Sequence, residues 1–171
     1  MDSKIEILAK VAEKYNTGLS HFLVPTIQKN NSTEGIGRFA DESIGENTSV
    51  AIIGGLLVDE PDGMIAMPMG AGLYLNQAHM LFRATTNHSC NPNLKVSGFN
   101  KLVSRRAIDK GEELTIDYGS ISVGKGMIII EKCNCKESCC RGKIKTDDYL
   151  NLPIDLLAAY AKYKRETDVV Y

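Results

Sequence analysis

The sequence lacks an excess of either charge, and it also lacks a long apolar stretch. Its 171 residues include 20 lysines and arginines against 21 aspartates and glutamates, which gives a formal net charge of −1 at pH 7. Without a basic surplus the chain has no general field that would attract phosphates, so we expect no direct nucleic acid binding. No apolar run approaches the roughly 20 residues that a membrane-spanning helix needs, which predicts no membrane association.

A secretory signal is absent too, because the first residues, MDSKIEILAKVAEKYNTG, contain no uninterrupted apolar core. We therefore expect an intracellular protein, in the nucleus if the source is eukaryotic or if the protein acts in a host cell, and otherwise in the cytoplasm. In a reducing compartment, cysteines serve more often as metal ligands or nucleophiles than in disulfides. The five cysteines of the chain are therefore candidates for chemistry.

Internal repeats, low-complexity tracts and linkers are absent as well, and 43 % hydrophobic with 24 % charged residues is typical of one globular domain. Apolar residues recur at helical spacing between Ile5 and Tyr15, and again after Pro153. Between these segments, short β-rich runs are separated by Gly, Pro, Asn and Asp clusters. We predict a mostly β fold with flanking helices: an N-terminal helix and lead-in strand over residues 1–28, and a C-terminal helix over residues 149–171. This last helix is expected to pack on the core, with a dimer or partner surface as the alternative.

Four of the five cysteines lie close together in the segment CNCKESCCRG, and the fifth, Cys90, lies far upstream in NHSCNPN. A structural zinc ion takes four tetrahedral thiolate or imidazole ligands. One possible ligand set is local and consists of Cys133, Cys135, Cys139 and Cys140. Neighbouring residues rarely both reach one tetrahedral ion, however, so a second set replaces Cys139 with Cys90. Four reduced thiols without a metal are the third alternative.

Three segments of the chain match motifs of a known family. They are NHSCNPN from Asn87 to Asn93, RRAIDKGEELTIDYG from Arg105 to Gly119, and the cysteine segment. Together they resemble the SET-domain protein lysine methyltransferases that carry a post-SET zinc segment. GIGRFA, which begins at Gly35, is similar to the opening glycine motif of that family. The resemblance implies a SET-domain β-fold in which the C-terminal stretch threads beneath a loop as a pseudoknot. It also implies a SET domain over residues 29–126 and a post-SET zinc segment over residues 127–148.

The resemblance implies a role for individual positions. Tyr118 corresponds to the catalytic tyrosine of the family. The positions implied to contact S-adenosylmethionine are Ile36, Gly37, Arg38, Asn87, His88 and Tyr118. The implied ligands of one structural zinc ion are Cys90, Cys133, Cys135 and Cys140, which leaves Cys139 as the spare thiol.

Several positions depart from the family pattern. Ala84, Thr85 and Thr86 stand where the family usually has Arg-Phe-hydrophobic, which bears on packing around the cofactor. No cysteine-rich pre-SET segment is present, because the other motifs account for the cysteines. Ile116 occupies the substrate-channel position at which many relatives carry a Phe or Tyr that limits the number of methyl groups. An aliphatic side chain there favours transfer to the di- or trimethyl state.

These observations predict S-adenosylmethionine-dependent methylation of a protein lysine, on a histone tail or on another basic protein. One alternative is a catalytically silent, zinc-bearing interaction module that has kept the fold. A further alternative makes Cys90 a thiol nucleophile with His88 as its base, although no third group is evident to orient that base.

Overall fold

The computed structural model describes residues 18–31, 35–60, 66–70, 73–76, 86–98, 100–122, 126–152 and 156. The predicted N-terminal helix lies outside the described residues, and so does most of the predicted C-terminal helix. At the start of the latter, the described chain forms a short 3-10 helix, η2 (Asp148–Asn151). A search of the described residues found no helix of sufficient length and hydropathy to cross a membrane.

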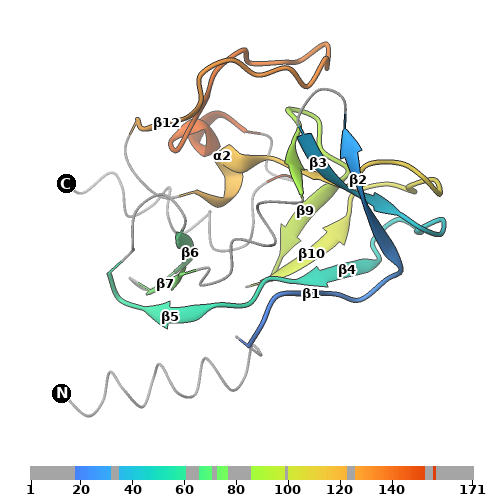
Figure 1. Cartoon of the computed structure of the whole chain (residues 1–171). Helices are drawn as coiled ribbons and strands as arrows, with labels where there is room; N and C mark the ends of the chain where they lie inside the picture. Colours follow the sequence, from blue (N-terminus) through green and yellow to red (C-terminus); the bar gives the residue numbers. More distant parts are fainter. Residues whose placement is uncertain are drawn as a thin grey trace.

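The described residues fold into several small sheets around a shared core, which confirms the prediction of a mostly β fold (Figure 1). The largest sheet is antiparallel, and in spatial order its four strands are β1 (His21–Phe22), β4 (Ser49–Ile52), β10 (Lys101–Ser104) and β9 (Leu94–Ser97). A second sheet places β7 (Leu73–Asn76) between β5 (Leu56–Val58) and β6 (Ala66–Gly70). Two hairpin-like pairs are formed by β2 (Thr26–Asn31) with β3 (Gly35–Ala40) and by β12 (Ile128–Ile130) with β13 (Ile144–Lys145).

The core lies where these sheets meet. Side chains alternate along the strands, so that Leu94 and Val96 of β9 are buried while Lys95 between them is only partly covered. Leu102 of β10 and Leu75 of β7 are fully buried in the same apolar cluster. Removal of such side chains from water supplies most of the driving force for folding. The core thereby fixes the strands from which the motif segments project.

The two central motif segments lie side by side as a parallel pair. Strand β8 (Asn87–His88) pairs with β11 (Thr115–Ile116), with Asn87 opposite Thr115 and His88 opposite Ile116. The Ser89 amide extends the pair by donating to the Ile116 carbonyl at 3.0 Å. Parallel neighbours cannot be joined by a tight turn, so their pairing requires the long excursion through β9 and β10.

Directly after β11 the chain turns into a short helix, α2 (Tyr118–Ile121). Asp117 caps this helix, because its side chain accepts a hydrogen bond from the Gly119 amide at 2.9 Å. Tyr118 is therefore the first residue of a helix, whereas the run ELTIDY suggests a strand. The helix contacts β13 and η2, which follow the cysteine segment.

A cluster of polar side chains fixes the segment that leads into β11. The buried side chain of Asn93 donates to the Glu112 carboxylate at 3.0 Å and to the Glu113 carbonyl at 2.7 Å. Its side-chain oxygen accepts from the Thr115 amide at 2.9 Å. Arg106 forms an ion pair with Glu112, in which one of its nitrogens donates at 3.1 Å. Burial alone would raise the pKa of Glu112, but the hydrogen bonds from Arg106 and Asn93 outweigh it, and the pKa lies below its ordinary value.

The substitution Glu112→Gln is expected to lower the free energy of unfolding at neutral pH, because an amide is a weaker acceptor for Arg106 than a carboxylate is. A carboxyl group whose pKa is lowered on folding stabilises the protein above its ordinary pKa, and this contribution is lost as the pH falls through the lowered value. The difference in stability between wild type and variant should therefore shrink on acidification. Urea denaturation over a pH series measures it.

The matched control is Glu131→Gln, because the Glu131 side chain is 72 % exposed and pairs with Lys143. We expect this control to change stability little at any pH. A wild-type advantage over Glu112→Gln that stays constant down to strongly acidic pH would contradict the assignment.

Candidate active site and metal centre

Four thiols from two distant parts of the chain converge on one point. The Sγ atoms of Cys90, Cys133, Cys135 and Cys140 all lie within 4.8 Å of one another. Cys90 is buried and the other three are partly buried, whereas Cys139 is exposed. The Cys139 thiol instead donates to the Cys90 carbonyl at 3.6 Å. Of the two ligand sets that the sequence allows, the structure brings together the one that includes Cys90.

The donor set fits a zinc ion. Tetrahedral zinc with sulfur ligands at about 2.3 Å holds its sulfurs roughly 3.8 Å apart, which a cluster of this size can accommodate. Backbone amides point at two of the sulfurs, from Arg141 to Cys90 and from Gly142 to Cys140, each at 3.4 Å. Burial raises the pKa of the Cys90 thiol, and it raises that of Cys133 to about 12. A divalent cation would supply the charge that lets such buried thiols ionise.

The loop that carries three of these cysteines is closed at its base. It lies between β12 and β13, and the Cys133 amide donates to the Gly142 carbonyl at 2.7 Å. In Figure 1 the orange segment that follows β12 extends along the same side of the molecule as α2. A metal ion bound by these thiols would therefore tie the cysteine segment to the loop that holds Cys90.

The buried His88 ring connects this centre to Tyr118. Its Nε2 lies 3.3 Å from the Cys90 Sγ, and its Nδ1 accepts the Tyr118 backbone amide at 3.2 Å. A backbone N–H can only donate, so Nδ1 is the unprotonated nitrogen and Nε2–H donates to the sulfur. Burial lowers the pKa of His88 to about 4, which keeps the ring neutral at physiological pH. A ring that donates to Cys90 is not arranged to accept its proton, and this geometry argues against a Cys90 nucleophile with His88 as base.

Tyr118 is held at both ends. Its hydroxyl donates to the Thr86 carbonyl at 2.9 Å, and its ring centre lies 5.5 Å from that of His88 at a tilt of 54°. Thr86 departs from the family pattern, but its contact with Tyr118 uses the backbone and does not depend on the side chain. Ala84 and Thr85, which also depart, lie outside the described residues.

Asn87 joins the glycine motif to the second motif. Its amide donates to the Ile36 carbonyl at 3.3 Å and to the Glu113 carboxylate at 2.7 Å. A Cβ atom at Gly37 would lie 2.3 Å from a carboxylate oxygen of Glu113, so a side chain there would displace Glu113. The Arg38 guanidinium points elsewhere and stacks 4.8 Å from the centre of the Phe22 ring. The close approach of Glu113 therefore explains why a glycine occupies position 37.

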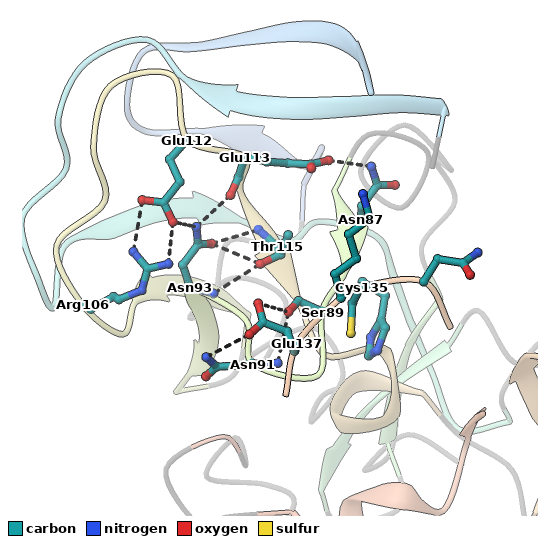
Figure 2. Close-up of a pocket in the computed structure, with 13 residues that line it drawn as sticks. Asn87, Ser89, Asn91, Asn93, Arg106, Glu112, Glu113, Thr115, Cys135 and Glu137 are labelled. Atoms are coloured by element: carbon teal, nitrogen blue, oxygen red, sulfur yellow. Dashed lines mark hydrogen bonds and ion pairs between the residues drawn. The ribbon is translucent and has the colours of Figure 1, made fainter. Parts of the chain in front are cut away.

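A polar pocket of about 440 Å³ opens between these segments (Figure 2). This volume lies in the range of small-molecule sites. Of the sequence-predicted residues, the pocket is lined by Asn87, His88 and Cys135. Ile36, Gly37, Arg38 and Tyr118 are not among its lining residues, although Asn87 contacts Ile36 and His88 contacts Tyr118. Ile116, predicted to line the substrate channel, is 2 % exposed and belongs to the core cluster.

Most of the pocket lining was not singled out in the sequence. The additional residues are Ser89, Asn91, Asn93, Arg106, Glu112, Glu113, Thr115, Asn134, Lys136 and Glu137. All of them lie inside the three motif segments, so membership of those segments is the signal that could have found them. Figure 2 shows Glu137 facing Ser89 and Asn91, whose side chains donate to it at 3.5 Å each.

Comparison with known proteins agrees with this arrangement. The family model described as "SET domain" matches residues 35–119. The chain is 29 % identical to the histone-lysine N-methyltransferase ash1 of Drosophila melanogaster over 151 residues, which covers 69 % of the chain and 7 % of that protein. It is 39 % identical to the histone-lysine N-methyltransferase ATXR3 of Arabidopsis thaliana over 72 residues, or 38 % of the chain and 3 % of that protein. The chain therefore spans less than a tenth of the length of either curated relative.

A solved structure shares the fold. The chain of KRYPTONITE, crystallised in complex with mCHG DNA and SAH, superposes with a TM-score of 0.55 and 21 % sequence identity. The match covers 72 % of this chain and 29 % of the KRYPTONITE chain. Residues 35–119 thus match the SET domain in sequence and the described chain matches its fold, and the family resemblance of the sequence motifs is confirmed.

The substitution Cys140→Ser is expected to reduce bound zinc well below about one ion per chain, because a serine hydroxyl is a much poorer zinc ligand than a thiolate. Cys139→Ser is the matched control, since it makes the same change at the adjacent residue and is expected to keep full zinc occupancy. Elemental analysis of the purified proteins provides the measurement. Equal zinc contents in the two variants would show that the ligand set is wrong.

Proposed function

We propose that this chain transfers methyl groups from S-adenosylmethionine to the ε-amine of a protein lysine. The observation that carries the proposal is the convergence of Asn87, His88 and the cysteine segment at one pocket in a region that matches the SET domain, with Tyr118 in contact with His88. Support comes from the curated relatives, both named histone-lysine N-methyltransferases. Further support comes from the KRYPTONITE structure, whose title includes SAH, the product that remains when S-adenosylmethionine has lost its methyl group.

The pocket has the chemistry to hold such a cofactor. S-adenosylmethionine carries an amino-acid group, ribose hydroxyls and an adenine ring, all rich in hydrogen-bonding atoms. The lining offers side-chain amides from Asn87 and Asn134 and carboxylates from Glu113 and Glu137. The backbone of Ile36 to Arg38 lies next to Asn87 and is proposed to complete the site. When bound, the cofactor would supply a methyl group on a sulfonium ion.

Tyr118 is proposed to orient the acceptor amine. A lysine amine has an ordinary pKa near 10.4 and is mostly protonated at neutral pH, whereas attack on a methyl group requires the neutral form. Desolvation beside a cationic group lowers an amine pKa. Because the Tyr118 hydroxyl uses its proton on the Thr86 carbonyl, its oxygen lone pairs remain able to accept from the amine. Alignment of this kind accounts for large rate accelerations without covalent chemistry.

The remaining assignments follow from the same proposal. Zinc is structural and holds the segment over residues 127–148 against the SET domain, which we place at residues 29–126. Residues 1–28 lead into the domain, and residues 149–171 follow the zinc segment. The substrate is a histone tail or another basic protein, methylated in the nucleus if the source is eukaryotic or if the protein acts in a host cell, and otherwise in the cytoplasm. Ile116 lies in the core opposite His88 and brings no hydroxyl that could hold a water near the site, which is proposed to favour the di- or trimethyl product.

The substitution Tyr118→Phe is expected to lower turnover by about 100-fold, the scale seen when one positioned polar group is removed from an active site. Zinc content and cofactor affinity should persist, because neither is proposed to depend on the hydroxyl. Transfer of labelled methyl groups to histones measures turnover, and calorimetry measures cofactor binding. Tyr74→Phe removes the same hydroxyl from β7, which does not line the pocket, and should leave turnover unchanged.

Unchanged turnover in Tyr118→Phe would remove Tyr118 from the mechanism. A wild-type protein that binds zinc but shows no affinity for S-adenosylmethionine would instead favour the silent interaction module.

A further inference from the structure

Arg141 links the metal centre to the helix that begins with Tyr118. It directly follows Cys140, and its guanidinium forms a two-pronged ion pair with Asp117, the residue before Tyr118. Nη1 donates to Oδ2 at 2.7 Å and Nη2 donates to Oδ1 at 2.8 Å. The Asp117 side chain is 1 % exposed and that of Arg141 is 24 % exposed, so the pair is shielded from water.

The same arginine has two further contacts. Its Nε donates to Asp148 at 3.1 Å, and the same carboxylate oxygen accepts the Lys145 amide. Its backbone amide donates to the Cys90 sulfur at 3.4 Å. One residue therefore contacts the metal centre, the cap of α2 and the chain that follows β13. A planar guanidinium with several fixed donors suits this arrangement, whereas a lysine has a single point of charge.

The charge balance makes Asp117 dependent on Arg141. Asp117 is one of the buried polar residues and carries a carboxylate that caps α2 at Gly119. A buried carboxylate that loses its cationic partner is strongly unfavourable. Arg141 is brought to Asp117 by the segment that holds Cys133, Cys135 and Cys140. The position of the first turn of α2 is therefore coupled to the order of the cysteine segment.

We propose that Arg141 is a positioning residue that couples zinc binding to the placement of Tyr118, through its two-pronged pair with Asp117. The inference rests on the proposed function for its effect on turnover, and on the structure alone for its effect on Tyr118. It makes the post-SET segment more than a cover for the pocket, because the segment supplies the counter-charge on which the tyrosine-bearing helix depends.

The test uses Arg141→Lys, which keeps the charge but loses the fork, and the double substitution Asp117→Asn with Arg141→Gln, which removes both charges together. The second variant keeps the test valid if the first folds poorly, because it leaves no unpaired buried carboxylate. Lys143→Gln is the matched control, since it removes one positive charge from the same segment and breaks only an ion pair with the exposed Glu131.

The structural readout is the Tyr118 signal in NMR spectra of protein with labelled tyrosines, assigned by its loss in Tyr118→Phe. In wild type and in Lys143→Gln, zinc addition should move the signal to one common position. In the Arg141 variants, the signal should differ from that position even though zinc is bound at full occupancy. A Tyr118 signal identical to wild type in both Arg141 variants overturns the proposal, whether or not the protein methylates anything.

The catalytic readout is a double-mutant cycle. Arg141→Lys should lower kcat at least 10-fold, with the KM for S-adenosylmethionine within about 2-fold of wild type and the loss much smaller in a Tyr118→Phe background. Equal losses in both backgrounds would show that Arg141 acts on structure in general and not through Tyr118. A wild-type protein without methyl transfer would refute the proposed function but leave the NMR result to decide the coupling.

Discussion

The convergence of Cys90 with three later thiols is the constraint on which the rest of the site depends. Cys90 is fixed by the core, because it follows β8, which is paired with β11. The cysteine segment has no comparable core of its own, since it is a loop between two short strands with exposed residues such as Met127 and Ile128 at its base. Shared coordination of one ion would give this segment a defined place. That place brings Cys135, Lys136 and Glu137 to the pocket and Arg141 to Asp117.

The region around Tyr118 is organised from several directions at once. The Thr86 carbonyl receives its hydroxyl, His88 receives its amide, and Asp117 caps the helix that it begins. These partners belong to segments that are far apart in the chain but adjacent in space through the β8–β11 pair. These separate contacts restrict the position of Tyr118 more than any one of them would alone, which is the kind of support that a positioned functional side chain requires.

The amount that could be predicted from the sequence differs between levels of structure. The alternation of short β-rich runs with turn residues was sufficient to predict a mostly β fold. Four close cysteines were sufficient to predict a metal centre, although spacing alone left two ligand sets open. The family resemblance implied the set with Cys90 in place of Cys139, and the fold brings those four thiols together. The family motifs indicated which segments form the pocket, but not which of their residues line it.

What the sequence could not show was decided by long-range contacts. Strands of two residues, such as β8 and β11, carry no periodic signal. The role of His88 depends on which atoms face each ring nitrogen: Cys90, two residues away, is a partner that the sequence suggests, but nothing near His88 in the chain indicates the Tyr118 amide on its other side. The role of Arg141 cannot be predicted locally, because an arginine after a cysteine has no specific signature and the buried partner of Arg141, Asp117, lies in another motif. Ile116 shows the same effect, since its alignment with a channel position gave no indication that it would lie in the core.

The contribution of residues 134–137 to the pocket has a consequence for the chain while it is still being synthesised. A nascent chain emerges from the ribosome with its N-terminus first. The strands around β4 and β10 can therefore assemble while the cysteine segment, which forms part of the pocket, is still inside the exit tunnel. A nascent chain at that stage has no finished site, and a small molecule cannot stabilise what it cannot yet bind. A ligand or ion that needs this segment can therefore stabilise the fold only after the segment has emerged, and the earlier core forms without that contribution.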